Sequence, residues 1–110
     1  MKLDKGLIAG SSTLLVLSLL EKEDRYGYQL IEELARRSNR TFELKEGTLY
    51  PILHGLEKGG FLTSYQQTAP TGRARKYYRL TRKGKDLLGE KKEEWEHFSR
   101  GVENVLASLA

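Results

Sequence analysis

Apolar residues along the chain fall into patterns that predict five segments of regular structure. The first segment covers residues 5–22, and in its second half leucine or valine occupies six of the seven positions from 14 to 20. A helix that is apolar nearly all round is buried on more than one side. In a chain of 110 residues, we expect a second subunit to cover one of those sides.

Two shorter amphipathic helices are predicted next. Over residues 26–37, apolar side chains recur with helical spacing and charged residues fill the opposite face; the apolar ones are Tyr26, Leu30, Ile31 and Leu34. Over residues 46–58, a second apolar stripe is formed by Leu49, Ile52, Leu53 and Leu56. Gly59 and Gly60 end this helix. Pro51 lacks a backbone N–H and is tolerated mainly near a helix start, which favours a start close to residues 47 and 48.

The fourth segment, residues 61–80, has the features of a β-hairpin. Residues 61–65 have strand composition, residues 68–72 are turn formers, and residues 73–80 alternate with a period of two. The alternation places Arg73, Arg75, Tyr77 and Arg79 on one, basic face. The other, mostly apolar face takes Ala74, Lys76, Tyr78 and Leu80.

A long helix is predicted from Thr81, a good N-cap residue, to the end of the sequence. Its apolar positions repeat every seven residues at Leu88, Trp95, Val102 and Leu109, and Phe98 and Val105 fill the second position of the repeat. A long helix with one apolar seam needs a partner, and the same helix or the first helix of a second subunit is the expected one. We therefore expect dimer contacts at Leu15, Leu19, Leu88, Trp95, Val102, Val105 and Leu109.

These segments predict a mainly α fold with a small two-stranded β-wing, that is, a winged helix-turn-helix plus a long C-terminal dimerisation helix. Residues 1–80 would form the winged-helix DNA-binding domain, whose first helix is shared with the dimer interface, and residues 81–110 the dimerisation helix. In this arrangement the second helix of the pair can enter the major groove of DNA. The hairpin can then reach the phosphate backbone.

The charge distribution also favours DNA as a partner. The formal net charge of +4 is a weak indication by itself, but residues 72–85 contain seven Lys or Arg and no acid. From the wing, we expect DNA contacts at Arg73, Arg75, Lys76, Tyr77 and Arg79. From the recognition helix, we expect them at Gly47, Thr48, Tyr50, Pro51 and His54. The latter face is short of side chains that read bases in bidentate fashion, so phosphate contacts and DNA shape should supply much of the binding.

Three blocks of the sequence resemble the PadR-like family of bacterial transcriptional regulators. They are residues 26–30 (YGYQL), residues 46–62 (beginning EGTLYP and ending LEKGGFL) and residues 72–81 (GRARKYYRLT), with Gly84 after the last. The three blocks occur in the family's order and span most of residues 10–85. This chain departs from the family pattern at Lys45, where a small capping residue is common, and at His54 and Gly55, where basic residues are common.

The resemblance implies a homodimeric winged-helix repressor of a neighbouring operon, with the first and last helices at the dimer interface. Because the sequence ends after one C-terminal helix, it is similar to the short members of the family. Some short members bind flat aromatic drugs in a pore at the dimer centre, lined by a tryptophan of the last helix. Trp95 lies at a similar place, so Trp95 and Phe98 are candidate ligand-binding residues. The implied partners are double-stranded DNA with a pseudo-palindromic operator, a second copy of the chain and a small aromatic effector.

The residues themselves leave some alternatives open. Trp95 suits a dimer core as well as a ligand-binding wall. Tyr26 and Tyr28 suit packing more than phosphate binding, and His54 suits a solvated surface. A winged-helix fold can also bind a protein partner without DNA, although such a module has little need for a basic wing.

The composition excludes several other classes of function. The chain has no cysteine and only two histidines, far apart, so we expect neither a disulfide framework nor a zinc site. We recognise no nucleophile with a base, no paired carboxylates and no phosphate-binding glycine loop, and we predict neither an enzyme nor a cofactor. The apolar run at residues 14–20 is far shorter than the ~20 residues of a membrane span, so we expect a cytoplasmic protein without membrane contact.

Overall fold

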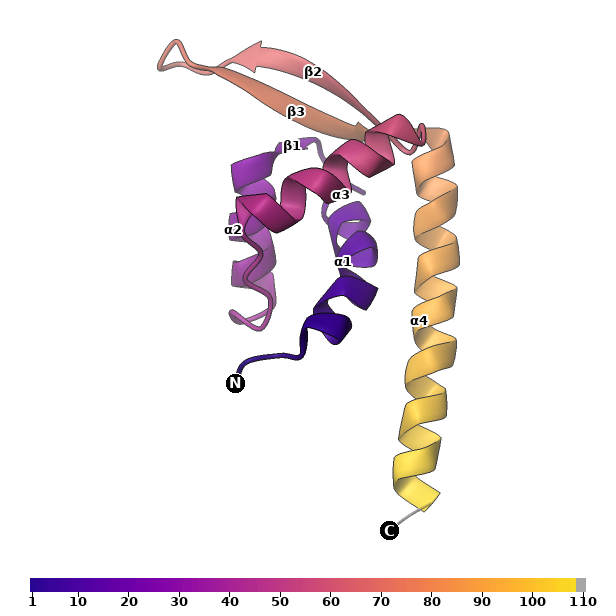
Figure 1. Ribbon diagram of the computed structural model, residues 1–110. Coiled ribbons are helices and arrows are strands. Elements are labelled where there is room, and N and C mark those ends of the chain that lie inside the picture. Colours follow the sequence, from indigo (N-terminus) through magenta and orange to yellow (C-terminus); the bar gives the residue numbers. More distant parts are fainter. Residues whose placement is uncertain (109–110) are drawn as a thin grey trace.

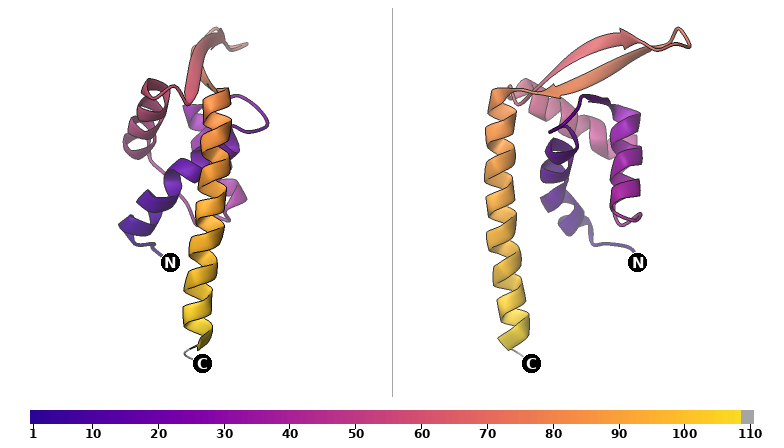
Figure 2. Two further views of the ribbon diagram at one scale, coloured as in Figure 1. Left: turned by 90° about the vertical axis from the view of Figure 1, so that its right-hand side faces the viewer. Right: turned by 180° about the vertical axis from the view of Figure 1, so that it is seen from behind.

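Three helices form a head that carries a β-hairpin and a long fourth helix (Figure 1). The structure, a computed structural model, describes residues 1–108. In chain order the elements are α1 (Lys5–Leu19), β1 (Arg25–Tyr26), α2 (Gly27–Arg37), α3 (Glu46–Lys58), β2 (Leu62–Thr68), β3 (Ala74–Leu80) and α4 (Arg82–Ser108). The hairpin lies over the head, whereas the C-terminal half of α4 extends away from it (Figures 1 and 2). The predicted mainly α, winged-helix architecture is confirmed.

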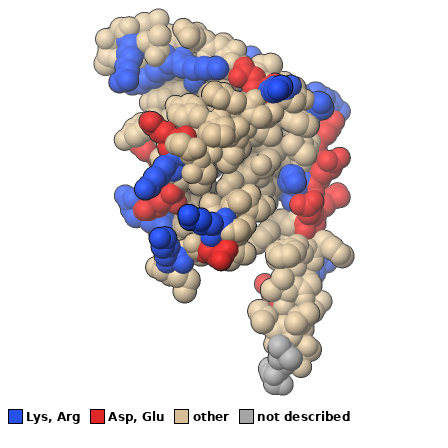
Figure 3. All heavy atoms as spheres, in the orientation of Figure 1, with Lys and Arg blue, Asp and Glu red and all other residues tan. Residues whose placement is uncertain are grey.

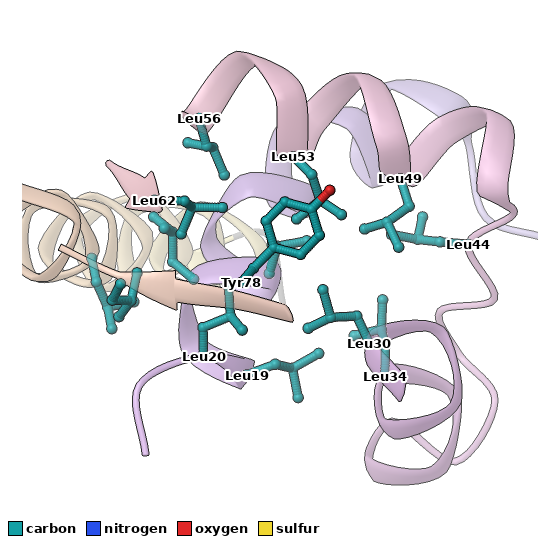
Figure 4. Close-up of a cluster of buried hydrophobic side chains, with 14 residues drawn as sticks. Leu19, Leu20, Leu30, Leu34, Leu44, Leu49, Leu53, Leu56, Leu62 and Tyr78 are labelled. Carbon is teal, nitrogen blue, oxygen red and sulfur yellow. The ribbon is translucent and has the colours of Figure 1, made fainter. Parts of the chain in front are cut away.

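The hydrophobic core lies between the three helices of the head and the root of the hairpin. α1 contacts both α2 and α4, and Val16 and Leu17 are almost inaccessible to solvent, as its apolar sequence predicts. Leucines of α2 and α3 converge on the ring of Tyr78, which β3 inserts among them (Figure 4). Full burial of one leucine contributes ~1.5–3 kcal/mol, so this cluster is the main source of stability. Its members are Val16, Leu17, Leu19, Leu20, Leu30, Leu34, Leu44, Leu49, Leu53, Leu56, Leu62, Tyr78, Leu80 and Leu88.

The wing belongs to a three-stranded antiparallel sheet in the order β1-β3-β2, one strand more than the pattern predicts. β2 pairs with β3 along its whole length, and it runs three residues further than the predicted strand, to Thr68. β1 adds only two pairs, Arg25 with Tyr78 and Tyr26 with Tyr77. A two-residue strand has no periodicity of its own, so the apolar spacing alone assigned Tyr26 to the helix that follows.

A buried arginine fixes the segment that leads into β1. The Nε of Arg25 donates a hydrogen bond to the carbonyl of Leu19 at 2.8 Å, and its guanidinium lies 3.0 Å from the carboxylate of Glu23. Arg25 is only 6% exposed, so both interactions offset the cost of removing its charge from water. The turn after α1 is thereby tied to the end of that helix.

α3 begins at Glu46, the first residue of the predicted segment 46–58, and tolerates Pro51 in its second turn. The helix therefore starts one to two residues before the position that the Pro51 argument favours. Because Pro51 has no N–H, the carbonyl of Gly47 loses its usual helical donor. The N-cap residue, Lys45, makes no side-chain capping bond, as expected where a small capping residue is replaced.

The start of α4 is locked onto the root of the wing. The Gly84 N–H donates to the Thr81 hydroxyl oxygen at 3.0 Å, which confirms Thr81 as the cap, and that hydroxyl donates to the Gly60 carbonyl at 2.7 Å. Gly84 lies so close to the backbone of Phe61 that a Cβ at this position would overlap the Phe61 carbonyl.

Within residues 1–108, no helix is both long and apolar enough to cross a bilayer.

Replacing Gly84 with alanine should destabilise the protein, because the new methyl group meets a backbone carbonyl that cannot rotate away. We expect the free energy of unfolding to fall by about 1–3 kcal/mol, the usual cost of overpacking. In Gly55→Ala, the control, the added Cβ meets nothing within 4 Å, so stability should stay the same or rise by up to ~1 kcal/mol. Urea denaturation followed by circular dichroism compares the two, and equal effects would contradict the close packing.

Candidate nucleic-acid interface

The exposed face of α3 carries most of the residues expected to enter the major groove. Gly47, Thr48, Pro51 and His54 are all solvent-exposed, whereas the leucines on the opposite face are buried in the core. Within residues 1–108, the Thr48 and His54 side chains form no hydrogen bond or ion pair. This face is therefore available to a ligand, and a helix of this size fits a groove ~12 Å wide.

Tyr50 differs from its neighbours, because its ring packs between α3 and α2. The ring lies directly against Gly27, and a Cβ at that position would overlap its hydroxyl end. Gly27 and Tyr50 come from two of the sequence blocks described above, and the structure brings these blocks into contact. Tyr50 is half-buried and sets the spacing of the helix pair, a role that helical periodicity on one element cannot indicate.

Two arginines of the wing, Arg73 and Arg75, lie near its tip. Arg73 is exposed at the turn, where Gly72 adopts a left-handed φ of 86° and Ala69 donates its N–H to the Arg73 carbonyl at 2.8 Å. Arg75, half-buried, lies 4.6 Å above the ring of Tyr26. Neither arginine pairs with an acid in the part of the chain that the structure describes. Lys and Arg atoms consequently gather along the wing in Figure 3.

The outer face of the wing is a ladder of aromatic rings and arginines. Tyr77 stacks on Tyr65 with ring centroids 5.6 Å apart and meets the edge of Tyr26 at 5.3 Å. Arg75 covers one end of this row, and Arg79 covers the other, 5.2 Å from the ring of Tyr65. Tyr77 thus packs between the rings of Tyr26 and Tyr65. A phosphate contact by its hydroxyl, as predicted, would have to be made while the ring stays in this place.

Arg79 is held by a carboxylate at the outer face. Asp24 Oδ2 accepts hydrogen bonds from Tyr65 Oη at 2.7 Å and from Arg79 Nε at 3.0 Å, and Arg79 Nη2 lies 2.9 Å from the same oxygen. Partial burial raises the pKa of Asp24, but the hydrogen bonds from Arg79 and Tyr65 and the arginine charge outweigh it, so the net pKa lies below its usual value. The same hydrogen bond to Asp24 raises the pKa of Tyr65.

A second carboxylate holds the inner face. Glu57, near the end of α3, accepts a hydrogen bond from the hydroxyl of Ser64 on β2 and lies 3.5 Å from the ammonium group of Lys76 on β3. The hydrogen bond from Ser64 lowers the pKa of Glu57, and the positive charge of Lys76 adds to this effect. Two of the predicted wing cations, Lys76 and Arg79, are therefore compensated by acids that the charge pattern of residues 72–85 does not contain.

Between the wing and the helix pair lies a polar cleft of about 480 Å³. Three cations and three tyrosines reach it from β3, β1 and the starts of α2 and α3, and one acid, Glu46, lies at its edge. The lining residues are Tyr26, Gly27, Tyr28, Glu46, Tyr50, Arg73, Ala74, Arg75 and Lys76. Cations and hydroxyl donors around one cleft suit a phosphate group.

The candidate ligand-binding residues lie far from the wing, in a groove of about 380 Å³ between α1 and α4. Trp95 and Phe98 form one wall, with ring centroids 6.1 Å apart, and α1 supplies the other wall. Trp95 is 49% exposed, so it does not belong to the core of this chain. The α1 residues in the groove are Gly6, Leu7, Gly10, Ser11 and Leu14.

The residues expected at a dimer interface separate into two groups. Leu19 and Leu88 are buried in the core of the single chain, and Leu15 is half-buried. Val102 and Val105 are exposed, as is Leu106, which the seven-residue repeat does not mark. Leu109 lies outside the described residues.

An exposed recognition helix beside a wing with uncompensated cations is the arrangement of a winged-helix DNA-binding protein. Residues 16–90 match the transcriptional regulator PadR-like family. The chain belongs to the PadR-like family and is a DNA-binding transcriptional regulator, not an enzyme. A transcriptional regulator of Mycobacterium tuberculosis is 42% identical to it over 77 residues, which cover 70% of this chain and 68% of that protein.

Solved structures agree with this assignment. A transcriptional regulator from Clostridium thermocellum matches with a TM-score of 0.83 at 33% identity, covering 90% of this chain and 96% of the other. A PadR-like transcriptional regulator from Bacillus cereus matches with a TM-score of 0.80 at 30% identity, covering 92% of this chain and 96% of the other. Both likenesses cover at least nine-tenths of this chain, so the fold described here is that of the family.

Proposed function

We propose that this regulator is a homodimeric repressor that leaves its operator when a small, flat aromatic compound binds between α1 and α4. The observation that carries the proposal is the exposed apolar face of α4 from Trp95 onward. Five side chains on this face are between 42% and 64% exposed: Trp95, Phe98, Val102, Val105 and Leu106. A continuous apolar stripe of this length is uncommon on a monomer and marks a contact surface.

A second copy of the chain is the partner that suits this face. Four of its five apolar residues follow the seven-residue repeat of helices that pair along a seam, and a seam pairs with itself in a symmetric dimer. Trp95, Val102 and Val105 would form the centre of the interface, and Leu15 of α1 would extend it. Leu19 and Leu88 support the interface from the core of each chain.

At the other end of the molecule, we place the DNA. Arg73 and Arg75 would neutralise phosphates, because no acid competes for them within residues 1–108, and the face of α3 with Thr48 and His54 would lie in the major groove. Two heads related by dimer symmetry read two half-sites about one helical turn apart, so the operator should be pseudo-palindromic.

The effector is proposed from the groove between α1 and α4. Trp95 and Phe98 offer two ring faces, and the glycines of α1 let a flat molecule approach the helix backbone closely. Aromatic ligands stack favourably on such rings. A second α4 would close the open side of the groove, so the site would be complete only in the dimer.

Anisotropy titration of labelled DNA from upstream of the gene, against scrambled DNA over a range of salt, tests the DNA contacts. Arg73→Gln or Arg75→Gln should weaken binding to both DNAs and lower the slope of log affinity against log salt by about 0.9 each. Arg100→Gln removes the same charge at the far end of α4 and should leave the slope unchanged. A slope that does not respond to either wing variant would remove the wing from the interface, and absence of binding at low salt would favour a protein partner.

Val102→Asp should convert the protein to a monomer, because two aspartates would face each other in an apolar seam. Light scattering after size-exclusion chromatography measures the molar mass. Arg100→Asp adds the same side chain two residues away, about 200° around the helix, and should leave the dimer intact. A dimer that persists in Val102→Asp would place the interface elsewhere.

Planar aromatic compounds should quench the fluorescence of Trp95, which is the only tryptophan in the chain and therefore reports on this groove alone. Compounds that quench should also weaken binding to the upstream DNA, and Phe98→Ala should reduce their affinity. If no compound of a broad panel changes the emission, Trp95 belongs to the dimer core only.

A further inference from the structure

The wing needs support beyond its own strands. Only its root is anchored in the core, through Leu62, Tyr78 and Leu80, and the turn that joins β2 to β3 projects beyond the head (Figure 1). A two-stranded ribbon is marginally stable in water and twists easily. For two rigid elements to bind one duplex, the angle between the wing and α3 has to be held before DNA arrives.

The two carboxylates described above act at the point where the ribbon leaves the head. Ser64 and Tyr65 are neighbours on β2, so their side chains point to opposite faces of the sheet. Glu57 takes the Ser64 hydroxyl on the inner face, and Asp24 takes the Tyr65 hydroxyl on the outer face. The hairpin is therefore held on both faces at residues 64 and 65. If it tilts in either direction, one of these two hydrogen bonds is stretched.

Each carboxylate also takes a cation from β3. Asp24 pairs with Arg79, and Glu57 pairs with Lys76, so each holds both strands of the hairpin. The carboxylate side chains are 23% and 32% exposed and the paired cations 61% and 44%, so water partly screens the charges, and the hydrogen bonds from Tyr65 and Ser64 strengthen each contact. Asp24 lies in the turn after α1 and Glu57 lies on α3, so the wing is attached to two different parts of the head.

We propose that Asp24 and Glu57 are positioning residues that set the angle between the wing and α3, with Arg79 and Lys76 serving as their partners instead of as phosphate ligands. The consequence for DNA rests on the proposed function of the wing. Two root cations orient the ribbon, and the uncompensated Arg73 and Arg75 nearer its tip bind the backbone. The predicted DNA contacts of Lys76 and Arg79 are then replaced by an indirect role.

Hydrogen exchange of the DNA-free protein tests the support directly. Asp24→Asn and Glu57→Gln keep the shape of the side chain but remove its charge, and each should raise amide exchange in β2 and β3 about three- to tenfold without changing exchange in α1. Tyr65→Phe removes one hydrogen bond to Asp24 without any change of charge and should give a smaller increase. Unchanged exchange in all three variants would overturn the proposal, whatever the protein binds.

Binding to DNA tests the division of labour between the cations. Arg79→Gln should leave the salt slope unchanged and reduce the preference for upstream over scrambled DNA, about threefold or more. Arg73→Gln, the matched change at the tip, should lower the slope by about 0.9. If Arg79→Gln lowers the slope as much as Arg73→Gln does, Arg79 is a phosphate ligand and the proposal is wrong. If no variant binds DNA, the proposed function fails, and the exchange result alone decides on the support.

Discussion

The burial of Tyr78 among the leucines of the head is the contact on which the remaining structure depends. β3 is hydrogen-bonded on both edges, to β1 and to β2, and it drives this one large ring between α2 and α3. The hairpin cannot leave the head without exposing that ring and the two leucines beside it. Both the wing and the start of α4, which follows β3 after one residue, take their positions from this anchor.

The arrangement of charge follows from the same geometry. Near the anchor, where the wing is close to α3 and to the turn after α1, the cations of β3 meet carboxylates and contribute to structure. Nearer the tip, Arg73 and Arg75 line the cleft between the wing and the helix pair but form no ion pair within residues 1–108, so their charge is available to a polyanion. The positive residues of the wing thus form two groups. Those near the core pair with carboxylates, and those nearer the tip do not.

Much of the fold could be predicted, because helical and strand periodicity report burial on one face of each element. The bounds of α3 and the cap of α4 at Thr81 were accessible in this way. The pattern could not reveal β1, which is two residues long, nor the acids that hold Lys76 and Arg79, since Asp24 lies 55 residues from Arg79 along the chain. The pattern also could not indicate that Tyr50 packs against Gly27, because only the packing of α2 against α3 brings the two residues together.

The seven-residue repeat of α4 has a limit of the same kind. One stripe runs along the whole helix, but its first member, Leu88, is covered by the chain's own core, whereas Trp95 and Val102 are exposed. Periodicity indicates that one face of a helix is apolar. It does not indicate which surface covers that face. A helical segment without tertiary contacts is marginally stable in water, so a second copy packed on the distal part of α4 would stabilise it. In the proposed dimer the same cover closes the groove at Trp95, and a ligand bound there would therefore act on the spacing of the two DNA-binding heads.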